Sequence, residues 1–249
     1  MIGDFVKVGT GWHGEMADCN AASAGVTSRM IRVLFSFILA GIVVARGQPP
    51  EVQKDKPAYG RPALIETSQL IEFGTLPEDR RKLIEGAIAV ARDSPWLPYR
   101  FGGSAPTDGG FDCSGAMYFV MCKAGLKPPR TSAEQFLWLN ENARLTSIPP
   151  SVKSLDHPEM KNLLPGDLLF WGGTYLPADG RRVNITHVAL FLGHEKKDHR
   201  AVMINATDGR SYRGTKANGY GVYDFQLPRE GSRAIFMGYG TPPGIARAK

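Results

Sequence analysis

The chain between residues 75 and 93 has the apolar spacing of an amphipathic helix. Apolar residues recur three and four positions apart, at Leu83, Ile84, Ala87, Ile88 and Ala91. Thr75-Leu76-Pro77-Glu78 precedes them with the spacing of a capping box, and Asp93-Ser94-Pro95 follows as a stop signal. The pattern therefore predicts that the folded part of the chain begins with a helix.

A second helix is predicted to start at Cys113. Asp112 is a favourable N-cap residue, residues 117–124 are mostly apolar, and Gly125 stands where a glycine often ends a helix. Thr131 or Ser132 is expected to cap a further short helix that runs through residue 139.

The second half of the chain changes from helical to strand-like patterns. Short β-rich runs are separated by Gly, Asp and Asn, at Asp167–Trp171, His187–Leu192, Val202–Ala206, Val222–Phe225 and Ala234–Tyr239. Helices followed by strands predict an α+β fold, with the N-terminal helices packed on an antiparallel sheet of about five strands. Asn140–Lys161 has no regular pattern and is expected to be a surface excursion.

The N-terminal region resembles a targeting segment. Arg29 and Arg32 precede an apolar run of about 13 residues, which is short for a membrane span, and small residues then flank Arg46. We therefore expect residues 1–47 to be an upstream extension and signal peptide that starts at Met30, with a retained signal-anchor as the alternative. Residues 48–74 are expected to be a linker or extended arm, and residues 75–249 one folded domain in a periplasmic or secreted protein.

Composition changes this picture little. The chain has 249 residues, 43% hydrophobic and 22% charged, which is enough for a full core. Three cysteines do not make a disulfide framework. The net charge of +6 comes from scattered Lys and Arg residues without a basic run, so a nucleic-acid partner is not expected.

Cys113 is the candidate nucleophile. A thiol in the first turn of a helix lies near unpaired N–H groups and the positive end of the helix dipole, and both favour the thiolate. The alternative is a small buried cysteine without chemical function.

A cysteine nucleophile needs an imidazole to exchange protons and a polar group to orient that imidazole. His187 opens an apolar strand and is the best-placed histidine, while His194 and His199 fall in a polar turn and are expected to be solvated. Asn205 is the one polar residue in the next strand, and its amide oxygen is expected to accept from one ring nitrogen. Structural roles for His187 and Asn205 remain the alternatives.

Other chemistries lack their patterns. No Cys-x-x-Cys or His-Glu-x-x-His sequence is present, so no metal is expected. Ser114 lacks the Gly-x-Ser-x-Gly context of a serine nucleophile, and the glycines near residues 102 and 109 fit no phosphate-binding pattern, so no cofactor is expected.

Several of these residues form an ordered set that resembles the NlpC/P60 family of bacterial cell-wall cysteine endopeptidases, which have a papain-like core. The set covers about residues 76–239 and consists of Tyr99-x-x-Gly102-Gly103, Phe111-Asp112-Cys113-Ser114-Gly115, Pro129-Arg130-Thr131-Ser132, Leu164-Pro165-Gly166-Asp167-Leu168 and His187-Val188 with Leu192-Gly193. The resemblance implies that Cys113, His187 and Asn205 form the catalytic triad and that Tyr99, Asp112 and Ser114 contact substrate. The third triad position is often His in this family.

The resemblance also implies a substrate. We expect a monomeric cysteine peptidase whose partners are peptidoglycan stem peptides, cut at the γ-D-glutamyl–diamino acid bond through a thioester. An N-acetylmuramyl-L-alanine amidase and a non-catalytic wall-binding module are the alternatives. Residues 173–186 are longer than the usual link before the histidine, and no SH3-like module is recognisable ahead of the catalytic part.

Overall fold

The computed structural model describes residues 59–247. The predicted leader, residues 1–47, lies outside this range. Within the described range, no helix combines the length and the apolar character that a membrane span needs.

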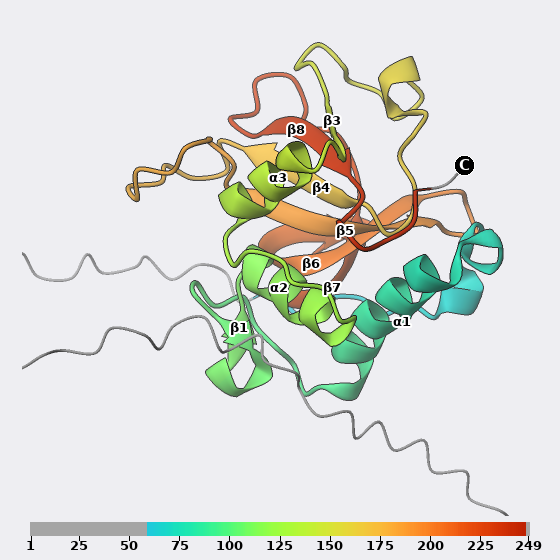
Figure 1. The fold of residues 1–249 in the computed structure, drawn as a ribbon. Coiled ribbons are helices and arrows are strands. Elements are labelled where there is room, and N and C mark those ends of the chain that lie inside the picture. The colour runs from blue at the N-terminus through green and yellow to red at the C-terminus, as the bar shows by residue number, and fades with distance from the viewer. Residues whose placement is uncertain (1–58, 248–249) are drawn as a thin grey trace, which may run out of the picture. The chain divides into compact units, whose positions relative to one another are not determined.

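A six-stranded antiparallel sheet forms the centre of the described chain, and three helices lie on one of its faces (Figure 1). The helices are α1 (Glu78–Asp93), α2 (Cys113–Lys123) and α3 (Ser132–Glu141). In sheet order the strands are β3 (Leu145–Ser147), β8 (Ile235–Gly240), β4 (Leu168–Gly172), β5 (His187–His194), β6 (Ala201–Tyr212) and β7 (Thr215–Asp224). The predicted α+β fold is confirmed, and β3 is the strand of this sheet that the sequence pattern does not predict. A separate two-stranded sheet of β1 (Ser104–Ala105) and β2 (Gly110–Phe111) is not predicted either.

Both faces of the sheet are buried, because alternate strand residues point to opposite sides. On β5, Val188 and Leu190 belong to the core beneath the helices, whereas Ala189 and Phe191 belong to a second core on the other face. This second core is covered in part by Ile148, Val152 and Met160. The segment expected to be a surface excursion therefore contributes buried side chains.

The helix starts follow the predicted caps in two of three cases. The Asp112 side chain accepts from the Gly115 N–H at the start of α2, and Thr131 makes a capping box with Glu134 at the start of α3. The capping box predicted for Thr75 is wrong, because Thr75 ends a 3₁₀ turn and its hydroxyl donates to the Glu72 carbonyl. Pro77 is the N-cap residue of α1 instead.

The described part of the expected arm packs against the sheet. Gly60 and Ala63 form bridges with β7, which cover the exposed edge of that strand. Glu72 then accepts hydrogen bonds from the backbone and the Nδ1 atom of His194. His194 is thus not simply solvated, and its hydrogen bond to Glu72 raises the pKa of its imidazole.

A buried ion pair joins the start of α1 to the turn before β4. Arg80 is fully buried, and its Nη1 atom lies 3.0 Å from Asp167 Oδ1 and 2.7 Å from the Pro165 carbonyl oxygen. Its Nη2 atom donates to Thr241, whose hydroxyl donates to Asp167 at 2.7 Å. Three segments that are distant in sequence therefore share one polar network, including the Leu164–Leu168 motif.

We expect Arg80→Ala to lower the free energy of unfolding by about 3–5 kcal/mol, because it leaves the Asp167 carboxylate buried without a counter-charge. Urea unfolding measures the change. Lys82→Ala is the control, since Lys82 forms an exposed pair with Glu78 on the same helix and should change the midpoint little. An equally small effect at both positions would show that the buried pair does not stabilise the fold.

Candidate active site

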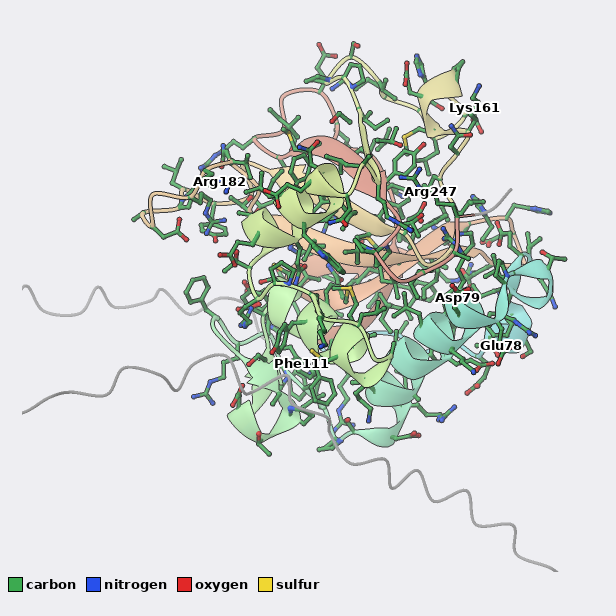
Figure 2. The ribbon with its side chains drawn as sticks, viewed as in Figure 1. Glu78, Asp79, Phe111, Lys161, Arg182 and Arg247 are labelled. Carbon is green, nitrogen blue, oxygen red and sulfur yellow. The ribbon has the colours of Figure 1, made fainter. Side chains whose placement is uncertain are left out.

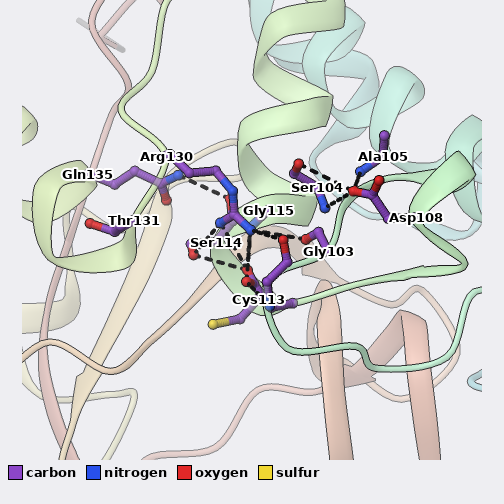
Figure 3. A network of polar contacts seen from close by, with 12 residues as sticks. Gly103, Ser104, Ala105, Asp108, Cys113, Ser114, Gly115, Arg130, Thr131 and Gln135 are labelled. Carbon is purple, nitrogen blue, oxygen red and sulfur yellow. Dashed lines mark hydrogen bonds and ion pairs between the residues drawn. The ribbon is translucent and has the colours of Figure 1, made fainter. Parts of the chain in front are cut away.

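The carboxylate of Asp112 fixes the start of α2. Its Oδ1 atom accepts from the Gly115 N–H at 2.6 Å and from the Ser114 hydroxyl at 3.1 Å (Figure 3). Cys113 is consequently the first residue of the helix, where the backbone N–H has no acceptor one turn earlier.

Arg130 fastens the glycine-rich loop to this helix start. Its Nη2 atom lies 2.8 Å from Asp112 Oδ2 and donates to the carbonyl oxygens of Gly102 and Gly103 at 2.9 and 3.2 Å (Figure 3). A Cβ atom on Gly115 would lie 2.0 Å from the Gly103 carbonyl oxygen, so only glycine permits this approach. The sequence motif Pro129–Ser132 contains Arg130, but nothing local to the motif indicates its partner.

His187 and Asn205 lie next to each other on neighbouring strands. The Nδ2 atom of Asn205 lies 2.6 Å from Nε2 of His187, and both side chains are buried. The two residues belong to the sheet face that carries Trp171, whose ring centroid is 5.5 Å from that of His187. The nitrogen of the amide, rather than the expected oxygen, faces the imidazole in this arrangement.

Cys113 approaches the same strand from the helix side. Its Sγ atom is 3.9 Å from the carbonyl oxygen of Thr186, and the N–H of Val188 also hydrogen-bonds to the sulfur. These two contacts are with the residues on either side of His187. The register between β5 and β6 begins only at Leu190 opposite Ile204, so the sulfur meets β5 ahead of that ladder.

Burial keeps both reactive groups neutral. Burial raises the pKa of the Cys113 thiol to about 11, and the charge of Asp112 adds to this effect, although N–H groups of Val188 and Ser114 oppose it. Burial also lowers the pKa of His187 well below its usual value of 6.5, and the charge of Arg210 acts in the same direction. Desolvation thus opposes the helix dipole, which favours the thiolate.

The three residues expected to contact substrate lie around the helix start. Ser114 donates to Asp112 and accepts from Arg130 Nη1 at 3.0 Å. Tyr99 is half-buried, and burial together with the nearby charge of Cys113 raises the pKa of its hydroxyl. Its backbone N–H donates to the Asn218 side chain at 2.9 Å, which connects this loop to β7.

The long segment between β4 and β5 is held by its own contacts. Arg181 donates to the Tyr175 hydroxyl at 2.9 Å and to the Ile185 carbonyl, and it pairs with Asp179. The Tyr175 ring meets the exposed ring of Phe101 edge-on at 6.4 Å. Figure 2 labels Arg182 on this projecting segment. Residues 173–186 therefore reach the loop that precedes α2.

The described residues contain no group of three or more His, Cys, Asp or Glu side chains arranged to hold a metal ion. The start of α2 carries a thiol and backbone N–H groups, and β5 and β6 carry the imidazole and the amide.

Comparison with known proteins matches the part of the chain that contains this site to a family. The model described as the NlpC/P60 family matches residues 97–220. The chain is 35% identical over 111 residues to the bifunctional muramidase/DL-endopeptidase CwlT of Bacillus subtilis, and 33% identical over 138 residues to the probable endopeptidase p60 of Listeria monocytogenes. These matches cover 45% and 55% of this chain but only 25% and 22% of the relatives, so the chain spans about a quarter of their length.

The solved structures that match the chain have lower identities. The peptidoglycan hydrolase RipB of Mycobacterium tuberculosis is 23% identical, with 68% of this chain and 69% of that chain covered and a TM-score of 0.37. A P60 domain from Mycobacterium avium subspecies paratuberculosis is 24% identical, with 65% and 96% covered and a TM-score of 0.38.

We expect the alkylation of Cys113 by iodoacetamide to accelerate steadily between pH 7 and pH 10, by about tenfold per pH unit, because only the thiolate reacts. Peptide mapping by mass spectrometry separates Cys113 from the other cysteines. A rate that is already constant below pH 8 would mean that the free site holds a thiolate–imidazolium pair.

The buried imidazole makes stability depend on pH. Unfolded His187 binds a proton near pH 6.5, whereas the folded residue stays neutral to lower pH, so stability falls as the pH drops below 6.5. We expect His187→Gln to reduce the change in the free energy of unfolding with pH, below pH 6.5, by up to about 1.4 kcal/mol per pH unit. Urea unfolding of both proteins at pH 7.5 and pH 5.5 measures it, and identical slopes would contradict the burial argument.

Proposed function

The part of the chain that holds Cys113, His187 and Asn205 belongs to the NlpC/P60 family, and on this premise we propose that the protein is a cysteine peptidase of peptidoglycan stem peptides. The observation that carries the proposal is the contact of His187 with Asn205 at 2.6 Å, beside a cysteine that is the first residue of a helix.

The proposed reaction begins with a neutral pair. His187 takes the proton of the Cys113 thiol as the sulfur attacks the scissile carbonyl, and then gives that proton to the leaving amine. This leaves a thioester on Cys113. Water hydrolyses the thioester with His187 as the base, which releases the acid product and restores the thiol.

The backbone of Cys113 supplies a donor for the oxyanion. As the first helical residue, it has an N–H that is directed out of the helix start and is not needed for the helix ladder. An N–H in this position stabilises the negative charge that develops on the carbonyl oxygen.

Asn205 is the proposed orienting group. A half rotation of the Asn205 amide group exchanges the positions of its nitrogen and oxygen atoms. Oδ1, which has no partner among the described residues, then accepts a hydrogen bond from the Nε2–H of His187. The Nδ1 atom then keeps the lone pair that accepts the Cys113 proton. In the other orientation Nδ1 carries the ring proton and cannot act as the base.

We assign the substrate bond as the γ-D-glutamyl–diamino acid bond, with Tyr99, Asp112 and Ser114 at the side of the groove that receives a free amine. The carboxylate of Asp112 already accepts from Gly115 and Arg130, so its contribution to the amine is mainly electrostatic. Two relatives fit this assignment by name, the DL-endopeptidase CwlT and the gamma-DL-glutamyl hydrolase of Bacillus subtilis.

The amidase alternative uses the same nucleophile on a different bond, and the wall-binding alternative needs no reactive thiol. The adjacent Cys, His and Asn favour an enzyme over a binding module. A substrate in the cell wall implies action outside the cytoplasm, in agreement with the predicted leader, and we propose a monomer.

We expect the purified protein to cleave synthetic stem peptides between γ-D-glutamate and the diamino acid, and Cys113→Ala to abolish the cleavage. Mass spectrometry of digested peptidoglycan identifies the new termini and separates an endopeptidase from an amidase. Undiminished cleavage by Cys113→Ala would exclude the mechanism.

Asn205 has a matched pair of variants that tests its role as an acceptor. Asn205→Leu should lower kcat by about 10²-fold, because it removes the acceptor that fixes the tautomer. Asn205→Asp keeps an acceptor and should retain more activity. Equal losses in both variants would mean that Asn205 acts by packing alone.

A further inference from the structure

A cavity of about 280 Å³ lies against β4 and β6, on the sheet face that carries His187. It is lined by Trp171, Arg210, Asp224 and residues of the segment 226–234. The centroid of the Trp171 ring is 5.5 Å from the centroid of the His187 ring and 4.5 Å from the guanidinium carbon of Arg210. Cys113, His187 and Asn205 do not line the cavity, and Trp171 is the residue that connects it to the His187 ring.

A β-bulge brings Arg210 to this face. On β6, Val202, Ile204 and Ala206 point into the core beneath the helices, and continued alternation would direct Arg210 there too. The register with β7 shifts between Asp208 and Ser211, where Gly209 has a φ of +88°. One extra residue on β6 reverses the alternation, so Arg210 stacks on Trp171 instead.

Arg210 has no acceptor of its own. Within residues 59–247 no carboxylate or carbonyl oxygen pairs with its guanidinium, and Trp171 also has an indole N–H without a partner. The one carboxylate that lines the cavity, Asp224, pairs with Arg200 at 3.3 Å and accepts from the Arg213 N–H at 3.0 Å, but its Oδ1 atom has no hydrogen-bond partner among the described residues. Arg210 and the Trp171 N–H thus offer a cation and a neutral donor to the part of the cavity that they line, and this pair suits an anionic ligand.

The charge of Arg210 is felt at both reactive groups. It lowers the pKa of His187, and the charged form of Cys113 in turn favours the charged form of Arg210. Burial lowers the pKa of Arg210 itself to about 10, so the residue is a cation at neutral pH. A bound anion would relieve the cost of this burial.

We propose that Arg210 recognises a free carboxylate of the stem peptide close to the scissile bond. This inference rests on the proposed function and adds a specificity-determining residue to it. A γ-linked glutamate keeps its α-carboxylate free, and the diamino acid carries a free carboxylate as well. The planar guanidinium can bind such a group through two parallel hydrogen bonds.

The test uses two pairs of stem peptides, and the members of each pair differ only in whether one carboxylate is free or amidated. In one pair this carboxylate is on the glutamate, and in the other it is on the diamino acid. The wild-type protein should cleave the acid form of one of these pairs about 10- to 100-fold better than the amide, judged by kcat/KM. No preference in either pair would overturn the inference without the use of any variant.

Arg210→Gln should bring the ratio of kcat/KM for the acid peptide to that for the amide peptide close to one, mainly by slowing cleavage of the acid peptide. Arg210→Lys should retain part of the preference for the acid peptide. Arg92→Gln is the matched control, since Arg92 is an exposed arginine on α1 that pairs with Asp93. Equal losses on acid and amide peptides in a folded Arg210 variant would mean that Arg210 only positions Trp171 and His187, and would overturn carboxylate recognition.

Binding to Cys113→Ala protein separates this inference from the proposed function. Calorimetry should detect tighter binding of the acid peptide than of the amide, and Arg210→Gln in the same background should remove the difference. If the wild-type protein cleaves neither peptide, the proposed function fails, while the binding preference still decides whether Arg210 reads a carboxylate.

Discussion

The hydrogen bonds of the Asp112 carboxylate determine where Cys113, the proposed nucleophile, lies. The carboxylate caps α2 through the Gly115 N–H and pairs with Arg130, which also binds the carbonyl oxygens of the glycine loop. Cap, loop and helix therefore form one rigid unit around Cys113. Because the glycine at residue 115 lets the loop pass directly over the helix, the same contacts define both the position of the sulfur and that of the glycine loop.

Burial gives this site its chemical character. A thiol and an imidazole taken out of water are both more stable as neutral groups, and here desolvation is the main cause of the shift in each pKa. A neutral pair can still react, because the proton moves from sulfur to imidazole as the bond to the carbonyl forms. In the proposed reaction, the helix N-terminus contributes by stabilising the negative charge that develops on the carbonyl oxygen, rather than by storing a thiolate beforehand.

Two of the three helix caps were predictable from neighbouring residues, whereas contacts between distant segments, apart from that of His187 with Asn205, were not. The cap at Asp112 and the glycine that ends α2 at residue 125 are local signals, and the structure follows both. β3 exists because three residues pair with β8, about 90 positions later, and their own sequence is not strand-like. Arg130 and Arg80 are set by partners in other segments, and Arg210 by a single extra residue in a strand. Apolar patterning alone does not contain this information.

The arrangement of the two sheet faces explains why residues so far apart in the chain meet. His187 and Asn205 occupy the face opposite the helices, and Cys113 comes from a helix on the other face. At His187 the strand β5 is paired with β4 but not yet with β6, because the β5–β6 ladder begins three residues later, at Leu190. The bulge in β6 adds Arg210 to that same face. The start of β5 is therefore the place on this strand where the groups of the proposed site, a thiol, an imidazole, an amide and a guanidinium, come closest together.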